Sequence, residues 1–242
     1  MPPEIGASAI AARQINISTI VPLAFSRSSF LGEKDIICAT INQRGSLHFE
    51  PGTELGAPTE FFSAGWQSNA VQTANWFSQI SVANNEKDVV EVIKKQFPDI
   101  IDLSVQSQSQ IPALYATVKH RQKKMPISLI SSGINKFISV MTAIRAFSSG
   151  AIMIDEIENG IYYGMYPEFW NALHQFAIES KTQLFLSTHS WECLKAASNV
   201  IDKFDKDFSL IQIFQKDGYS KAVVVPGDKA AAAIENGIEV RG

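Results

Sequence analysis

Two adjacent carboxylates follow a short apolar run in the middle of the chain. The run Ile152-Met153-Ile154 leads directly into Asp155 and Glu156. In an open α/β sheet, ligands bind beyond the carboxyl ends of parallel strands. Because successive strand residues point in opposite directions, we expect two different roles: Asp155 would hold Mg²⁺, and Glu156 would orient or deprotonate a water molecule. The alternative is an ordinary strand end with two solvated acids.

A second apolar run ends in polar residues and a histidine. The run Leu184-Phe185-Leu186 precedes Ser187-Thr188-His189-Ser190. If the two runs are neighbouring strands, His189 reaches the same edge as Glu156, where an imidazole could donate a hydrogen bond to a terminal phosphate. The plainer interpretation is that His189 caps the following helix or satisfies a buried carbonyl.

A small polar turn stands directly before apolar residues at helical spacing. The turn is Ile130-Ser131-Ser132-Gly133, and the helix is expected from Ile134. Backbone N–H groups at a helix N-terminus, with serine hydroxyls beside them, form an anion site. Ser131, Ser132 and Gly133 are therefore candidates for phosphate contact. The alternative is a plain serine N-cap.

The elements that must position these residues alternate between strand and helix after Pro126. The uninterrupted apolar character of 151–154 predicts a central strand covered on both faces, and 184–186 is the next buried strand. Pro167 suits the first turn of the helix between them. This order predicts parallel neighbours joined by a right-handed crossover. The chain then closes with a hairpin over 209–225 and a short Ala-rich helix.

The first half of the chain has a different pattern. Residues 35–41 and 46–49 are typical of an antiparallel hairpin. Two helices follow, and the second is expected to be capped by the Asn85 side chain and ended by Pro98. Strand-like runs at 100–105 and 114–120 come next.

Composition restricts the class of protein. With 242 residues and 45% hydrophobic side chains, the chain can bury a large core. The formal net charge of −3 gives no global positive field for nucleic acid, so DNA contact would need a local patch. The basic run 119–124 is expected to be a solvated loop. Cys38 and Cys193 suit buried thiols in a reducing compartment. No run approaches roughly 18 apolar residues, so we expect a cytoplasmic protein that does not enter the membrane.

Taken in order, the three segments resemble the signature, Walker B and switch-histidine motifs of ABC-type ATPases. The surrounding residues, Ile157 to Tyr163 and Trp191-Glu192-Cys193, are similar to those of AAA-type ATP-binding proteins related to the recombination, structural-maintenance and overcoming-lysogenisation-defect (OLD-type) ATPases. The resemblance implies an α/β P-loop NTPase fold with a parallel core sheet, flanking helices, antiparallel strands and a helical insert. Residues 126–242 would form the ATPase core, and residues 1–125 the antiparallel strands and the insert.

The resemblance also implies roles and cofactors. The cofactors would be ATP and Mg²⁺, with Asp155 near the metal, Glu156 as the catalytic carboxylate of Mg-dependent hydrolysis and His189 on the γ-phosphate. Ser131 and Gly133 would contact the nucleotide of an opposite subunit, in a head-to-tail homodimer or with a partner ATPase or effector subunit. Relatives act in DNA repair, chromosome handling and phage defence.

One family motif does not occur in the sequence. A phosphate-cradling P-loop requires Gly-x-x-x-x-Gly-Lys-Ser/Thr, and the 242 residues contain none. We therefore expect an N-terminally truncated copy, a misassigned start or a separately encoded half. A second hypothesis is a non-hydrolysing binding module that offers its signature segment in trans. A third is a metal-dependent nuclease whose ligands would be Asp155, Glu156, Glu158 and His189.

Overall fold

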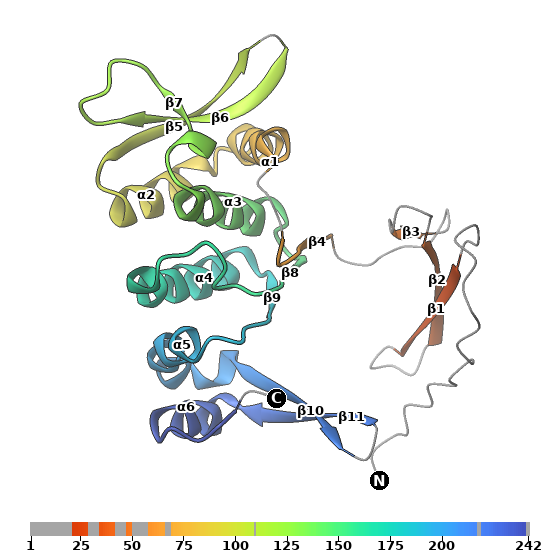
Figure 1. Ribbon diagram of the computed structural model, residues 1–242. Coiled ribbons are helices and arrows are strands. Elements are labelled where there is room, and N and C mark those ends of the chain that lie inside the picture. The colour runs from red at the N-terminus through yellow and green to blue at the C-terminus, as the bar shows by residue number, and fades with distance from the viewer. Residues whose placement is uncertain are drawn as a thin grey trace. The chain divides into compact units, whose positions relative to one another are not determined.

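A computed structural model describes residues 21–28, 34–41, 47–49, 58–65, 69–108, 110–216 and 219–240. The chain divides into two compact units, Met1–Gly56 and Ala57–Gly242. Each unit is described by itself, with the element labels of Figure 1.

The described part of the first unit is an antiparallel sheet. Its strands are β1 (Val21–Ser28), β2 (Lys34–Ile41) and β3 (Leu47–Phe49), in that order across the sheet. The pairing of β2 with β3 confirms the predicted hairpin. Its connecting residues, and the surroundings of Cys38, lie outside what the structure describes.

A parallel sheet organises the second unit. It consists of β4 (Thr59–Phe62), β8 (Ala151–Ile154) and β9 (Gln183–Leu186), with β8 in the centre. Helix α4 (Tyr166–Ser180) connects β8 to β9 and begins with a proline in its first turn, which a helix tolerates because the first N–H groups lack intrahelical partners. The prediction of parallel neighbours joined through a helix is confirmed.

Two helices follow β4, and only the first is capped by an asparagine side chain. Helix α1 (Ala70–Val82) begins after Asn69, whose Oδ1 accepts a hydrogen bond from the Val71 N–H at 3.1 Å. Helix α2 (Glu86–Gln96) begins after Asn85, which makes no side-chain capping bond. The predicted Asn85 cap is therefore wrong, because its backbone (φ −105°, ψ 4°) is not in the extended conformation of a capping residue. The helix ends before Pro98, as predicted.

Helix α3 (Ser132–Ala146) lies deep in the core. The predicted apolar stripe is confirmed, since Phe137, Ile138, Met141 and Ile144 are 0% exposed. A buried hydroxyl pair, Thr73 Oγ1 and Ser139 Oγ at 3.0 Å, joins α1 to α3. Each hydroxyl thereby gains the hydrogen-bond partner that burial demands.

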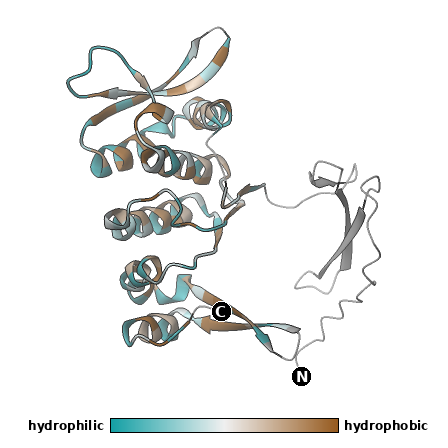
Figure 2. Ribbon diagram, viewed as in Figure 1, coloured by the Kyte–Doolittle hydropathy of each residue, from teal (hydrophilic) through white to brown (hydrophobic). Residues whose placement is uncertain are grey.

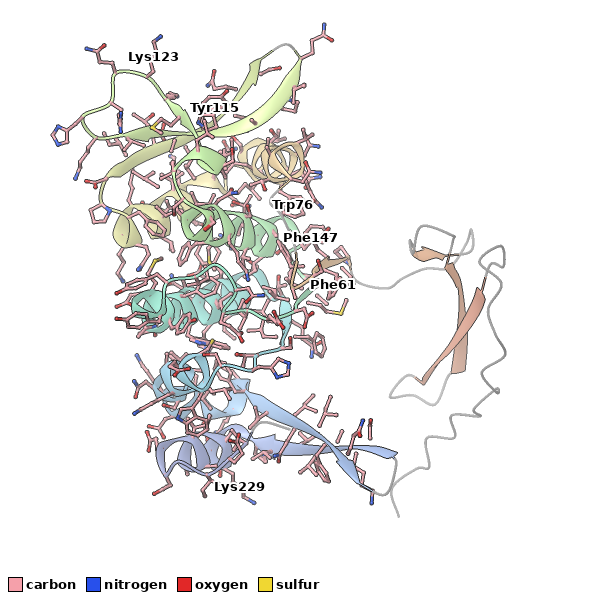
Figure 3. The ribbon with its side chains drawn as sticks, in the orientation of Figure 1. Phe61, Trp76, Tyr115, Lys123, Phe147 and Lys229 are labelled. Carbon is pink, nitrogen blue, oxygen red and sulfur yellow. The ribbon has the colours of Figure 1, made fainter. Side chains whose placement is uncertain are left out.

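Within the second unit, the described residues cover only one face of the parallel sheet. Ile152 and Ile154 are 0% and 2% exposed, but Met153 between them is 36% exposed. Its cross-strand neighbours Phe61 and Phe185 are 55% and 46% exposed, and Figure 3 labels Phe61 at the edge of the core. Within the second unit, the described residues therefore cover β8 on one face only, where the sequence predicted cover on both, and the prediction of a buried 184–186 is wrong at Phe185. We call Phe61, Met153 and Phe185 the open row.

An antiparallel sheet packs against the first helices. It contains β5 (Ile100–Gln108), β6 (Ile111–Val118) and the short β7 (Met125–Pro126), followed by the 3-10 turn η1 (Ile127–Leu129). The basic run 119–124 connects β6 to β7 and is exposed throughout; Lys123 projects from it in Figure 3. The prediction of a solvated loop is confirmed.

The C-terminal part is a helix, a hairpin and a final helix. Helix α5 (Trp191–Lys203) leads through η3 (Asp205–Asp207) to β10 (Ser209–Lys216) and β11 (Tyr219–Pro226), which form the predicted hairpin, and α6 (Gly227–Glu235) follows. Apolar residues line the hairpin (Figure 2). Within the described ranges, no helix is both long and apolar enough to cross a bilayer.

Candidate functional site

Ser187 joins the ends of β8 and β9. Its hydroxyl donates to Asp155 Oδ1 at 2.5 Å and accepts from the backbone N–H of Glu156 at 2.9 Å. Its own N–H donates to the Ile154 carbonyl at 2.9 Å, and its carbonyl accepts from the Ile157 N–H at 3.0 Å. The acidic pair and the segment that leads to His189 therefore lie at one rim of the sheet. The sequence analysis did not single out Ser187, although its position directly after β9 was a usable signal.

Glu156 turns the chain sharply at the end of β8. It has a positive φ of 47°, a left-handed conformation that costs a residue with a Cβ on the order of 1 kcal/mol. Asn159 holds the turn, because its side-chain amide donates to the Glu156 carboxylate and its N–H donates to the Glu156 carbonyl at 3.0 Å. The strand has thus already ended at Glu156, so the alternation of a regular strand does not set the directions of Asp155 and Glu156.

Glu158 links this turn to the histidine segment. Its Oε1 accepts from the backbone N–H groups of His189, at 3.0 Å, and Ser190, at 3.2 Å. Its Oε2 is buried and has no hydrogen-bond partner in the described residues. His189 itself is exposed at the rim. The Ser190 hydroxyl, rather than His189, caps α5 by accepting from the Cys193 N–H at 3.1 Å.

The turn before α3 caps this helix and packs against the loop after the acidic turn. Ser131 is exposed and is the N-cap of α3, with its hydroxyl accepting from the Ile134 N–H at 3.1 Å. Ser132 is exposed and is the first residue of the helix. A Cβ at Gly133 would lie 2.6 Å from the carbonyl oxygen of Gly160, so only glycine allows this close approach. The N-terminus of α3 therefore packs directly against the loop that follows the acidic turn.

Lys136 is a second contact between α3 and the acidic turn, which the sequence analysis missed. Its Nζ donates to the carbonyls of Glu156 at 3.2 Å and Asn159 at 2.7 Å. Burial lowers the pKa of Lys136, while the negative charge of Glu158 is the first of the nearby influences that favour its charged form. A lysine between the apolar residues of α3 was the available signal.

The rim offers hard oxygen ligands but no complete metal cage. Asp155 supplies a carboxylate and Ser187 a hydroxyl, the oxygen types that Mg²⁺ accepts together with waters and phosphates. Among the described residues, no three His, Cys, Asp or Glu side chains come together as a metal-binding group. The ligand set of the nuclease hypothesis is therefore not assembled at this rim.

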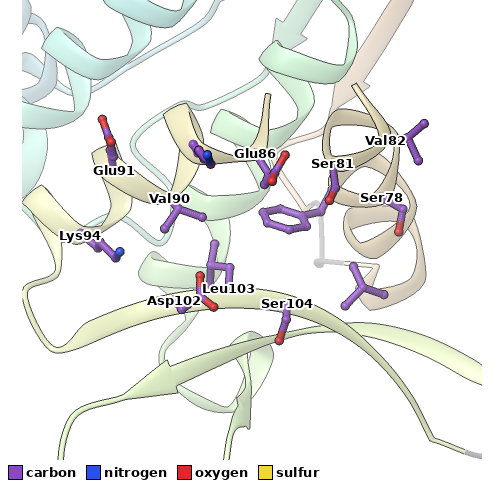
Figure 4. A pocket seen from close by; sticks show the side chains of 13 residues that line it. Ser78, Ser81, Val82, Glu86, Val90, Glu91, Lys94, Asp102, Leu103 and Ser104 are labelled. Atoms are coloured by element: carbon purple, nitrogen blue, oxygen red, sulfur yellow. The ribbon is translucent and has the colours of Figure 1, made fainter. Parts of the chain in front are cut away.

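A separate cavity lies between the first two helices and the antiparallel sheet. Its volume is about 810 Å³, and it is lined by α1, α2 and β5, including Phe77, Val90 and Asp102 (Figure 4). None of the predicted site residues lines it.

Cys193 is a buried thiol with a raised pKa. The side chain is 1% exposed, and burial raises the pKa of its thiol to about 11. This confirms the predicted buried thiol at Cys193.

Comparisons with known proteins identify the class that this arrangement belongs to. The family model "AAA ATPase domain" matches residues 67–194, which include all three motif segments. The chain belongs to this family, and membership supports an ATPase-type activity. A curated relative from Helicobacter pylori, named ATP/GTP phosphatase, is 30% identical over 95 residues; the match covers 38% of this chain and 25% of that protein. The chain thus spans about a quarter of the length of that relative.

Similar solved structures include heads of SMC proteins. An SMC head crystallised with the C-winged helix domain of ScpA is similar with a TM-score of 0.50 and 12% identity, over 87% of this chain and 76% of that one. The SMC head domain from Thermotoga maritima gives a TM-score of 0.43 and 16% identity, over 85% of this chain and 73% of that one. The family match and the similarity at a TM-score of 0.50 show the α/β P-loop NTPase fold of SMC-type ATPase heads, as the motifs predicted.

Proposed function

We propose that this chain carries the water-activating half of a Mg-dependent ATPase site. The observation that supports this most is the rim itself, where Ser187 ties Asp155 to the segment of His189 through a 2.5 Å hydrogen bond. Membership of the AAA ATPase domain family gives the substrate class.

Each rim residue has a proposed role. Asp155 and the Ser187 hydroxyl would hold Mg²⁺ together with waters and phosphate oxygens, and the metal would stabilise developing charge on the phosphates. Glu156 would orient and deprotonate the attacking water. His189 would donate a hydrogen bond to the γ-phosphate and so respond to its presence.

We propose that a P-loop from outside these 242 residues completes the site. The sequence contains no such loop, and a P-loop is carried by a strand and the helix that follows it. The open row supports this proposal, because parallel sheets are normally covered on both faces. Phe61, Met153 and Phe185 would then be covered by the helix that follows the P-loop.

We further propose a head-to-tail dimer in which the α3 N-terminus faces the nucleotide of the other subunit. Ser131, Ser132 and Gly133 would contact that phosphate, in a second copy or a partner ATPase. Residues 126–242 would supply the core together with β4, and the remainder of residues 1–125 would supply the antiparallel strands and insert. A cytoplasmic setting is consistent with the buried Cys193 thiol. A role in DNA repair or phage defence would follow from the kinship with recombination and OLD-type ATPases.

A non-hydrolysing binding module is the second candidate. The missing P-loop favours it, since a chain without one would present Ser131 and Gly133 only in trans. Equilibrium ATP binding with a P-loop segment supplied separates the two candidates: binding that weakens with Asp155→Asn supports the ATPase site, whereas binding that is unaffected by Asp155→Asn supports the module.

The test of the first candidate is Mg-dependent ATP turnover, measured for the chain alone and together with a separately supplied P-loop segment. Glu156→Gln should lower turnover by about a hundredfold or more, as expected for loss of a general base. The control is Glu179→Gln, an exposed acid on α4, which should leave turnover unchanged. Equal turnover for wild type and Glu156→Gln would refute the catalytic assignment.

A further inference from the structure

A single lysine connects α3 to the backbone of the acidic turn. Lys136 lies one turn into α3, next to Asn135 and Phe137, which are 7% and 0% exposed. Its Nζ reaches the carbonyls of both Glu156 and Asn159. These two residues bracket the turn, so one ammonium group fixes both of its ends.

The Glu156 carbonyl matters because Glu156 is in the left-handed region, with φ 47°. Such a residue persists only when its surroundings over-determine the conformation. The carbonyl accepts from Lys136 Nζ at 3.2 Å and from the Asn159 N–H at 3.0 Å. Hydrogen bonds from a charged donor are stronger than neutral ones, so Lys136 contributes a substantial part of this constraint.

Glu158 continues the connection on the other side of the turn. Its Oε1 accepts from the N–H groups of His189 and Ser190, while its charge favours the charged form of Lys136. Its Oε2 is buried without a hydrogen-bond partner in the described residues, so the two N–H groups on Oε1 are the contacts that hold this carboxylate.

We propose that Lys136 and Glu158 act as a pair of positioning residues, which together fix the acidic turn and the 189–190 backbone to the N-terminal half of α3. A shift of α3 would thereby move Glu156 and His189 together. The positioning role rests on the contacts of Lys136 with the Glu156 and Asn159 carbonyls and of Glu158 with the His189 and Ser190 N–H groups; its consequence for hydrolysis rests on the proposed function.

Hydrogen exchange of backbone amides tests the structural part on the full chain. The reporters are the N–H groups of Asn159, Ile161, His189 and Ser190, each of which donates to an acceptor within this network. Lys136→Met should speed their exchange about tenfold or more, whereas core amides of α4 should change little. Lys195→Met, an exposed lysine on α5, is the matched control and should change neither set.

A double-mutant cycle tests whether the two residues act as a pair. Glu158→Gln should also speed exchange at His189 and Ser190, and adding it to Lys136→Met should produce less than the product of the two single effects. Lys136→Arg should restore much of the protection. If Lys136→Met does not fold, Lys136→Gln serves in its place. Unchanged exchange in the lysine variant, or strictly multiplicative effects, would overturn the proposal.

Turnover measurements test the consequence separately. In the active assembly, Lys136→Met should lower kcat more than it raises KM, because the turn rather than the nucleotide is displaced. If wild type hydrolyses no ATP, the proposed function fails, but the exchange data still decide the positioning role. A rise in KM alone would show that Lys136 acts through nucleotide binding instead.

Discussion

The two faces of the parallel sheet differ sharply, although the same three strands form both. On one face Phe62, Ile152 and Ile154 are at most 2% exposed and belong to the main core. On the other, the open row of Phe61, Met153 and Phe185 is 36% to 55% exposed. Both faces are apolar in sequence, so composition alone does not distinguish them.

The difference indicates that one face of the sheet has its packing partners among the described residues of the second unit and that the other face does not. Parallel sheets are normally covered by helices on both faces. Apolar side chains that stay in contact with water, as in the open row, do not contribute the free energy of burial. The rim with Asp155 and Glu156 lies at the C-terminal ends of the strands, next to both faces. The open row is therefore the part of this sheet that the described residues of the second unit leave exposed.

The largest expected effect on stability is at Ile152, which is compared with its neighbour Met153 on the opposite face of β8. Ile152→Ala should lower the free energy of unfolding by about 2–5 kcal/mol, because a fully buried side chain leaves a cavity. Met153→Ala should cost about 1 kcal/mol or less, because the side chain is partly solvated already. Urea denaturation of both variants checks this. Equal losses would mean that the open row is covered in solution.

Thiol labelling compares the two faces chemically. With its thiol pKa raised from 9.0 to about 11, Cys193 has a thiolate fraction about a hundredfold below an ordinary thiol at pH 8. Phe185→Cys should therefore react at least about a hundredfold faster than Cys193 with a maleimide probe. Peptide mass spectrometry assigns each site. Rapid modification of Cys193 in the folded protein would contradict its burial.

The pKa of Cys193 also predicts how stability depends on pH. Because the folded pKa is raised above the ordinary value of 9.0, the contribution of the neutral thiol is fully present below pH 9 and is lost as pH rises towards about 11. Cys193→Ala should remove this alkaline decline, which thermal denaturation across that range would detect. An identical decline in Cys193→Ala would assign it to other groups.

A substitution at Gly133 tests how closely α3 packs against the loop that follows Glu156. Gly133→Ala places a Cβ 2.6 Å from the Gly160 carbonyl oxygen, and relieving this clash should cost about 1–3 kcal/mol. Urea denaturation of the variant measures this cost. Because Gly133 is only half-buried, the loop after Glu156 could instead move aside, and an unchanged denaturation midpoint would show that it does.

The smallest effect concerns the cap of α3. Ser131→Ala removes the hydroxyl that accepts from the Ile134 N–H and should cost about 1 kcal/mol. Ser132→Ala, one residue later, is the control and should be nearly neutral. Calorimetry measures the stability of both variants. A larger loss for Ser132→Ala than for Ser131→Ala would mean that Ser132 is the cap.

Local patterns in the sequence predicted the elements that carry the rim. Apolar periodicity gave α3 and α4, and the uninterrupted run before Asp155 gave β8. Coverage of both faces could not be predicted this way, because burial depends on which elements pack against a strand. The Asn85 cap failed because the conformation of the preceding turn, and not residue type, decides whether a side chain can reach the helix N–H groups.

Tertiary contacts account for what the sequence did not reveal about the site. Ser187 and Lys136 are 32 and 20 positions away from the Asp155 and Glu156 that they contact, so no local spacing marks them. The left-handed Glu156 is equally unpredictable, because glycine or asparagine is the usual residue there.

The most direct test of the account locates the metal–nucleotide complex. Mn²⁺ in place of Mg²⁺, added with ATP to the full chain, broadens the NMR signals of nearby amides. A metal–nucleotide site at the rim should give selective broadening of amides 155–158 and 187–190, with the hairpin β10–β11 unaffected. Broadening centred on the cavity between α1, α2 and β5, or none at the rim even when a P-loop segment is supplied, would contradict it.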